Sequence, residues 1–308
     1  MPAMPVVPVS PTRQRLPSWF KRSLPDNGVA AHTNEVVRKH GLVTVCEEAT
    51  CPNRQECWSK KAATFMLMGH ACTRTCTFCD VDYVRTPPPL DATEPERTAA
   101  AIRELGLRFA VITSVNRDDL ADGGSRHFAA TIAAVRAASP GTLIEVLTPD
   151  FLGKAAAIDT VITARPDVYN HNLETTARLY PTVRPQAKYQ RSLDLLKRVK
   201  ATNPTIWAKS GMMVGLGETD DEVRRVMDDL RAHGVDIMTI GQYLRPSLTH
   251  HDVIRFVSPE QFEQYKVWGR EAGLAYVASG PYVRSSYVAE EVLNGALNLS
   301  DLRRTQES

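Results

Sequence analysis

The chain has 308 residues, of which 43% are hydrophobic and 23% charged, as in a globular protein with a sizeable core and one large or two small domains. The net charge of only +2 does not indicate nucleic-acid binding. No apolar run approaches the ~20 residues that a membrane-spanning helix needs. The proline-rich residues 1–30 lack the continuous apolar core of a signal peptide. We expect an extended arm over 1–30 and a cytoplasmic location.

Apolar, β-rich runs then alternate with amphipathic stretches. Strands are expected at 65–69, 109–115, 143–151, 168–174, 206–217, 236–244 and 274–280. Helices are expected at 94–105, 127–138, 191–201, 220–232 and 259–272. Strands that alternate with helices of this length predict βαβ units and a parallel sheet. Without an early Gly-x-Gly-x-x-Gly, they predict an α/β fold with a partial or near-complete (β/α) barrel over 65–280.

All six cysteines lie between positions 46 and 79, which favours metal ligation in a reducing compartment over a disulfide scaffold. Cys72, Cys76 and Cys79 have the spacing Cys-x3-Cys-x2-Cys and follow the first expected strand. They therefore fall in the first loop at the C-terminal end of the barrel. Four thiolates complete a [4Fe–4S] cluster, and three leave one iron open to a small molecule. The alternative is a zinc knuckle with a distant fourth ligand.

This spacing, with Phe78 just before the last cysteine, closely resembles that of the radical S-adenosylmethionine (SAM) family. The resemblance implies that Cys72, Cys76 and Cys79 are the catalytic cluster ligands and that SAM chelates the open iron. An electron from the cluster would cleave SAM to methionine and a 5′-deoxyadenosyl radical, which removes hydrogen from an unactivated C–H bond.

Two further groups of residues are candidates for binding SAM. The run 211–218, GMMVGLGE, fits the family's Gly-x-Ile-x-Gly-x-x-Glu pattern with a methionine at the third position. This motif predicts that three residues either lie at the adenine end of SAM or form a plain turn without a ligand: Gly215, Gly217 and Glu218. Three polar residues at the ends of expected strands either contact the ribose or the methionine carboxylate of SAM or are structural polar residues of the barrel rim: Asn172, Glu174 and Lys209. The family's Gly-Gly-Glu is replaced by TSVNRDDLADGG, which leaves the binder of the SAM amino nitrogen open.

The first triplet, Cys46, Cys51 and Cys57, has the spacing Cys-x4-Cys-x5-Cys. Together with the second triplet, TSVNRDDLADGG and the RSSY motif at 284–287, it closely resembles the lipoyl synthases over nearly the whole chain. The resemblance implies a second, auxiliary [4Fe–4S] cluster held by these cysteines and Ser286. Ser285 is the alternative ligand, and a helix cap is the other interpretation of Ser286. Extensions over 31–64 and 281–308 would cover the barrel mouth.

The resemblance implies insertion of two sulfur atoms, at C6 and C8 of an octanoyl chain on a partner's lysine, with the auxiliary cluster as sulfur donor. An alkoxide is a harder ligand than a thiolate and is more easily lost, which suits an iron that must be released. The partners would be an octanoylated carrier (a 2-oxoacid dehydrogenase subunit or the glycine cleavage carrier), a reductant such as ferredoxin or flavodoxin, and an iron–sulfur carrier that rebuilds the cluster. No nucleic acid or membrane is expected.

Two surface features and two other functions stay open. The RDDL run at 117–120 is expected to form an ordering Arg–Asp pair, to bind the substrate peptide or to cap the next helix. Residues 161–200 hold eight basic and three acidic residues, which either steer an acidic carrier or form a solvated helix face. The other functions are a biotin-synthase-like enzyme and a non-enzymatic iron–sulfur or zinc protein. Electron-transfer clusters, however, normally have complete cysteine ligation.

Overall fold

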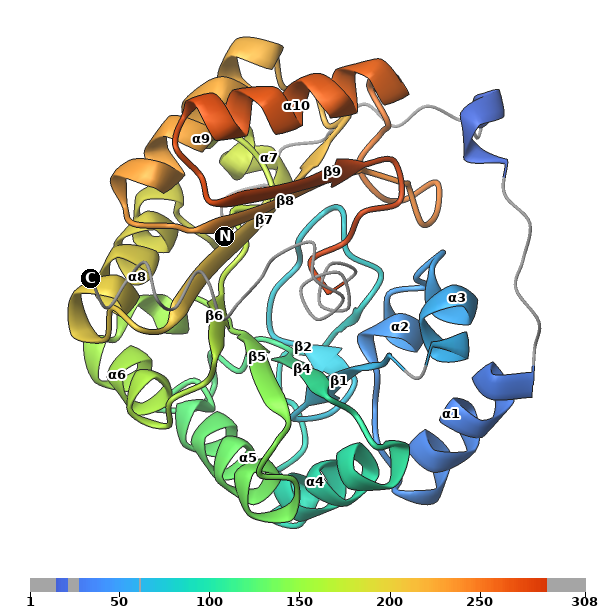
Figure 1. Ribbon diagram of the computed structural model, residues 1–308, viewed down its shortest axis with the longest axis vertical. Coiled ribbons are helices and arrows are strands. Elements are labelled where there is room, and N and C mark those ends of the chain that lie inside the picture. Colours follow the sequence, from blue (N-terminus) through green and yellow to red (C-terminus); the bar gives the residue numbers. More distant parts are fainter. Residues whose placement is uncertain (1–14, 22–27, 61, 287–308) are drawn as a thin grey trace.

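A computed structural model describes residues 15–21, 28–60 and 62–286. Its main feature is a seven-stranded parallel sheet in the order β1-β4-β5-β6-β7-β8-β9. The strands are β1 (Thr64–Leu67), β4 (Phe109–Ser114), β5 (Leu143–Leu147), β6 (Val168–Asn170), β7 (Trp207–Val214), β8 (Ile237–Gln242) and β9 (Tyr276–Gly280). With β1 and β9 as its edges, the sheet curves around an interior as an open barrel (Figure 1). The predicted partial (β/α) barrel is confirmed.

Helices cover the outer face of this sheet (Figure 1). They are α4 (Glu94–Leu105), α5 (Ser125–Ala138), α6 (Ala155–Thr163), α8 (Tyr189–Thr202), α9 (Asp220–Ala232) and α10 (Pro259–Glu271). The loops add η2 (Phe151–Gly153), η3 (Ala177–Leu179) and α7 (Tyr180–Val183). Five of these helices agree with the predicted ones within two residues at each end. Helix α6 was not predicted, because it has only nine residues and most of them are apolar, so the helical spacing of its buried residues does not stand out.

The strands are buried on both faces, as parallel strands between helices and a barrel interior must be. Along β4, Ala110 and Ile112 join the core beneath the helices, while Val111 and Thr113 line the interior. Strands β5 and β6 end four residues earlier than predicted. The polar residues that follow each of them belong to site loops instead.

The N-terminal residues form a small helical layer at the open side of the barrel (Figure 1). It consists of η1 (Ser18–Phe20), α1 (Gly28–Lys39), α2 (Val45–Glu48) and α3 (Arg54–Ser59). Thr33 Oγ1 on α1 donates a hydrogen bond to Trp58 O on α3 at 2.9 Å, and Thr44 forms an antiparallel bridge with Phe65 of β1. The layer is thereby attached to the first edge of the sheet.

The division at residues 30, 64 and 280 stays a prediction. Most of the expected extended arm, Tyr287 of the RSSY motif and the polar tail lie outside the described residues. Of the helices that the structure describes, none is long and apolar enough to cross a membrane.

Candidate active site

The second triplet lies on a loop at the C-terminal end of β1. Cys72 ends the short strand β2 (Ala71–Cys72), which pairs with β3 (Asp82–Tyr83) and closes the base of the loop that holds Cys76 and Cys79. Thr73 N donates to Asn116 O at 3.1 Å, which fixes the loop to the one after β4. The loop position that the sequence predicts for this triplet is therefore the observed one.

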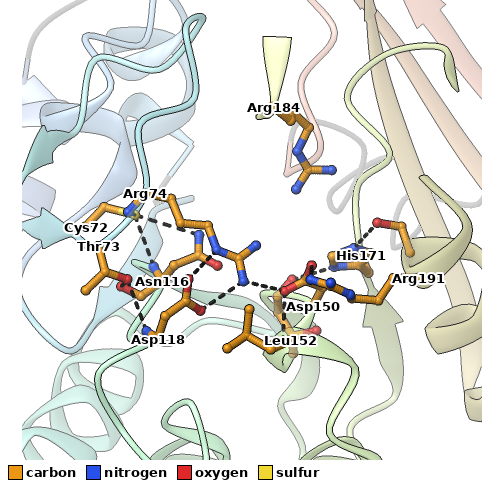
Figure 2. Close-up of polar contacts among 12 residues, drawn as sticks. Cys72, Thr73, Arg74, Asn116, Asp118, Asp150, Leu152, His171, Arg184 and Arg191 are labelled. Carbon is orange, nitrogen blue, oxygen red and sulfur yellow. Dashed lines mark hydrogen bonds and ion pairs between the residues drawn. The ribbon is translucent and has the colours of Figure 1, made fainter. Parts of the chain in front are cut away.

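Backbone N–H groups are directed at the sulfur of Cys72 (Figure 2). Arg74 N and Asn116 N each lie 3.4 Å from Cys72 Sγ, and Asn116 Nδ2 lies 3.7 Å from it. Donors to a cysteine sulfur stabilise negative charge there and tune the potential of a cluster bound to it. The loop after β4 thus contributes to the electronic surroundings of Cys72.

Buried charges hold the same loop from below (Figure 2). The Arg74 guanidinium donates to Asp118 at 2.6 and 2.9 Å and to Asp150 at 2.6 Å. Arg191 donates to the other Asp150 oxygen at 3.1 Å. Burial by itself would raise the pKa of Asp150, but the Arg74 cation holds that pKa well below its usual range. The cysteine loop is therefore tied through ion pairs to the loops after β4 and β5.

The RDDL run orders itself by the Arg–Asp pairing that was one of its expected roles. Arg117 is buried and donates to Asp119 at 2.9 and 2.8 Å. Asp118 is held by Arg74, as described above. Asp122 accepts N–H groups just before and within the first turn of α5, so the side chain that stabilises the start of that helix lies just beyond the run.

The first triplet lies in the helical layer at the open side of the barrel. Cys46 is in α2, Cys57 is in α3, and Cys51 in the connecting turn donates its N–H to Cys46 O at 3.2 Å. Burial raises the pKa of Cys46 and Cys76, and it raises the pKa of Cys57 and Cys79 to about 12. In both triplets a metal would have to displace protons from buried thiols.

Both triplets open into one cavity of about 1060 Å³ inside the barrel mouth. Its lining includes all six cysteines and, from the C-terminal segment, Ser285 and Ser286. Asn172 and Glu174 after β6 line it as well. The structure thus brings the predicted metal ligands and two of the predicted SAM contacts into one space.

The donor sets fit iron–sulfur clusters, because each consists of three free cysteines that line the cavity. In a [4Fe–4S] cluster each cysteine binds a different iron, so the sulfurs stand apart around the cluster. Each triplet supplies three thiols to the cavity lining, so each can bind three irons of such a cluster and leave the fourth to another ligand.

Asn172 and Glu174 form a small polar group in the cavity wall. Asn172 Nδ2 donates to Glu174 Oε1 at 2.9 Å and to Ser285 Oγ at 2.7 Å. Asn172 Oδ1 is buried and has no hydrogen-bond partner among the described residues. Burial raises the pKa of Glu174, and Arg184 opposes that shift. An unpaired amide oxygen next to a carboxyl group offers acceptors to a ligand with hydroxyl groups, which supports the predicted ribose contact.

Lys209 is not part of the cavity lining. Its ammonium donates to both oxygens of Glu145 on β5, at 2.9 and 2.8 Å, and Asn170 Nδ2 donates to the same carboxylate at 2.8 Å. All three side chains are buried, and a buried cation requires its counter-ion. The expected contact between Lys209 and SAM has no support in this arrangement.

Gly215, Gly217 and Glu218 form the turn between β7 and α9 and also lie outside the lining. The Glu218 carboxylate accepts N–H groups of Gly215 at 2.7 Å and Leu216 at 2.9 Å. Gly215 and Gly217 have φ values of 98° and 110°, which residues with a Cβ rarely adopt. Backbone conformation thus accounts for both glycines, which favours the plain-turn alternative. The predicted adenine contact stays a prediction.

The basic stretch 161–200 is not a row of unpaired surface charges. Four of its eight cations are paired with carboxylates of neighbouring elements: Arg178 with Glu222, Arg191 with Asp150, Arg198 with Asp159 and Lys200 with Asp236. Half of the positive charge on which the carrier-steering interpretation depends is therefore already neutralised within the chain, and the interpretation stays a prediction.

Arg184, one of the cations of that stretch, is instead a site residue that the sequence did not identify. It is buried, lines the cavity and donates from Nη1 to the carbonyl oxygens of Asn172 at 2.8 Å and Leu173 at 3.2 Å. In Figure 2 its guanidinium points toward the space above Arg74. Nothing in the sequence separates it from the basic residues around it.

Comparison with solved structures supports the fold. SuiB from Streptococcus suis, bound to S-adenosylmethionine, aligns with a TM-score of 0.54 and 13% identity over 74% of this chain and 55% of that chain. A methylornithine synthase aligns with a TM-score of 0.52 and 14% identity over 71% of this chain and 72% of that chain. At these identities the likeness concerns the fold alone.

Comparison with sequences is more specific. Residues 66–230 match the model of the Radical SAM superfamily. A curated lipoyl synthase from Rubrobacter xylanophilus is 55% identical over 279 residues, which cover 91% of this chain and 87% of that relative. On these matches, and with both cysteine triplets on one cavity, this chain belongs to the lipoyl synthase family within the radical SAM superfamily.

Proposed function

We propose that the chain is a lipoyl synthase, a SAM-dependent sulfurtransferase that inserts sulfur at C6 and C8 of an octanoyl group carried on a protein lysine. The observation that carries this proposal is that two cysteine triplets from different elements open into one cavity. Sulfur insertion needs C–H activation and a sulfur source at the same carbon, so both sites must face one substrate.

Each ligand set has its place in this proposal. Cys72, Cys76 and Cys79 hold the cluster that binds SAM. The other set holds the auxiliary cluster: Cys46, Cys51, Cys57 and Ser286. When bound, these groups supply the electron that cleaves SAM and the sulfur that is inserted.

The chain's own residues bind, orient and exclude water. Asn172 and Glu174 offer acceptors to the ribose hydroxyl groups, and Arg184 fixes the backbone that carries them. The octanoyl chain is apolar, and the cavity lining provides matching apolar side chains: Met66, Val111, Val115, Leu147, Met212 and Met213. A largely apolar cavity inside the barrel also limits the access of solvent to a reactive radical.

The remaining partners follow from this chemistry. An octanoylated carrier domain of a 2-oxoacid dehydrogenase or of the glycine cleavage system presents the substrate. A reductant such as ferredoxin or flavodoxin supplies electrons, and an iron–sulfur carrier rebuilds the auxiliary cluster. We place the reaction in the cytoplasm.

A direct test uses anaerobically reconstituted protein with SAM, dithionite and an octanoyl-lysine peptide. Mass spectrometry should find two sulfur atoms added to the peptide, each in place of a carbon-bound hydrogen. Each insertion should yield one 5′-deoxyadenosine. A peptide that gains no sulfur, from protein that inserts sulfur into dethiobiotin, would favour the biotin-synthase-like alternative.

Matched variants separate the two sites. The Cys46→Ala/Cys51→Ala/Cys57→Ala protein should still form 5′-deoxyadenosine but add no sulfur. The Cys72→Ala/Cys76→Ala/Cys79→Ala protein should form neither product. Sulfur insertion by the first of these variants would overturn the assignment of the sulfur source.

A further inference from the structure

Residues 281–286, here called the serine segment, carry Ser285 and Ser286 and follow the edge strand β9. The segment turns inward from β9 toward the middle of the barrel (Figure 1). Val283 packs against a small interior core with Trp207 and Ile237, and Ser285 and Ser286 line the cavity. The position of these serines therefore depends on the contacts that hold the serine segment beside the edge strand β9.

Tyr282 is held by two parts of the chain that are distant in sequence. Its hydroxyl donates to Phe20 O at 2.6 Å, and its ring packs edge-on against the Phe20 ring, with 5.4 Å between centroids. Phe20 is only 5% exposed and also packs against Phe256. On the other side, Asn53 Nδ2 donates to Tyr282 O at 2.6 Å. Asn53 lies between the second and third cysteines of the first triplet, so this bond joins the serine segment to that triplet directly.

One glycine of a neighbouring strand, Gly241, makes room for the segment. A Cβ on Gly241 of β8 would lie 2.0 Å from Val283 O, whereas one on Gly211 of β7 would first meet Thr239 Oγ1 at 2.5 Å and Asn172 Oδ1 at 2.8 Å. Contacts below 3.0 Å are sterically excluded, so any side chain at Gly241 would push the segment away. Neither glycine has a positive φ. Close approach of the segment, rather than backbone conformation, therefore explains why Gly241 has no side chain.

We propose that Phe20, Asn53 and Gly241 are positioning residues for Ser286, which hold the serine segment against the first triplet before any cluster is present. The inference rests on the proposed role of Ser286 as the fourth ligand of the auxiliary cluster. An alkoxide is a weaker partner for iron than a thiolate, so this ligand depends on being held in place. Preorganisation by contacts from both sides lowers the entropy cost of bringing a distant serine to the site.

The first measurement is amide hydrogen exchange of residues 281–286 in metal-free protein. Phe20→Ala and Gly241→Ala should speed exchange there by about tenfold or more, and Tyr282→Phe, which removes one oxygen, by up to about tenfold. Trp19→Ala is the control for Phe20, because Trp19 is the adjacent aromatic residue and is 40% exposed. Gly141→Ala is the control for Gly241, because a Cβ at Gly141 meets no atom within 4 Å. Both controls should match the wild type.

The second measurement is iron release from reconstituted protein to a chelator, with Ser286→Ala as the reference. Phe20→Ala and Gly241→Ala should release the auxiliary iron at a rate close to that of Ser286→Ala, and the controls should not. Unchanged exchange and unchanged release in both variants, with faster release in Ser286→Ala, would overturn the positioning proposal alone. Unchanged release in Ser286→Ala would instead refute serine ligation, and with it the basis of the inference.

Discussion

Different contacts hold the two cysteine triplets. Buried charges from neighbouring barrel loops hold the loop with Cys72, Cys76 and Cys79, whereas contacts between N-terminal and C-terminal segments of the chain hold the site of the first triplet. Arg74 ties the second triplet to the loops after β4 and β5. The first triplet lies on short helices outside the barrel, and its proposed fourth ligand is more than 200 positions away. One site is thus a product of barrel topology, and the other is assembled by long-range contacts. The site of the first triplet can therefore be loosened without disturbing the loop of the second triplet.

The largest expected effect concerns the charges beneath the second triplet. Arg74→Met leaves the fully buried Asp150 with the partly exposed Arg191 as its remaining ion-pair partner, and removal of one partner of a buried pair costs about 3–5 kcal/mol. The free energy of unfolding of metal-free protein, measured with urea, should fall by about that amount. Lys60→Met is the control beside the first triplet. Lys60 is half-exposed in its pair with Glu56, so the change should be below about 1 kcal/mol. Equal small losses in both variants would contradict the comparison.

Thiol reactivity tests whether burial protects a cysteine in each of the two triplets to the same extent. Cys57 and Cys79, one from each triplet, both have a pKa raised by burial to about 12 from an ordinary 9.0. At pH 8 in metal-free protein, iodoacetamide should label each about a thousandfold more slowly than in urea-unfolded protein, since only the thiolate reacts. Mass spectrometry of the labelled peptides measures both rates. Rapid labelling of one cysteine alone would show that loop architecture, rather than burial, controls its thiol.

The same pKa values predict the pH dependence of stability. Because the folded thiols hold their protons more tightly than the unfolded ones, their contribution to stability is complete below pH 9 and is lost as the pH rises toward 12. The free energy of unfolding of metal-free protein should therefore fall over this range. Cys57→Ala and Cys79→Ala should each make that fall shallower, and a slope unchanged in both would contradict the assignment.

A smaller effect is expected within the helical layer. Thr33→Val removes the buried hydrogen bond from α1 to Trp58 O on α3, which should cost about 1 kcal/mol and speed amide exchange in α3. Thr160→Val is the control, because the bond from Thr160 to Ala156 O is exposed and can be replaced by water. Exchange in the loop of the second triplet should not change in either variant. A change there would show that the two sites are mechanically coupled.

The sequence allowed the parts of this molecule that rest on local pattern to be predicted. Alternating strand and helix patterns led to the open barrel, and cysteine spacing at the end of β1 led to the second triplet's loop. Helix α6 was not predicted because its nine residues are mostly apolar and do not contrast a buried face with a polar one. Each of these outcomes depends on residues close together in the chain.

Contacts between residues that are distant in the sequence could not be predicted. Lys209 stands near a strand end, but only the register of β5, β6 and β7 shows that Glu145 already neutralises it. Arg184 could not be distinguished from a surface cation before its burial was known. The bond between Asn53 and Tyr282 joins positions 229 residues apart, and no local pattern encodes such a contact.

The central claim is that the two triplets hold two separate [4Fe–4S] clusters, and iron and sulfide analysis with Mössbauer spectra tests it most directly. Anaerobically reconstituted wild-type protein should contain about eight irons per chain. The Cys46→Ala/Cys51→Ala/Cys57→Ala variant should contain about four and still cleave SAM. About four irons or fewer in the wild type, or tightly bound zinc, would contradict the account.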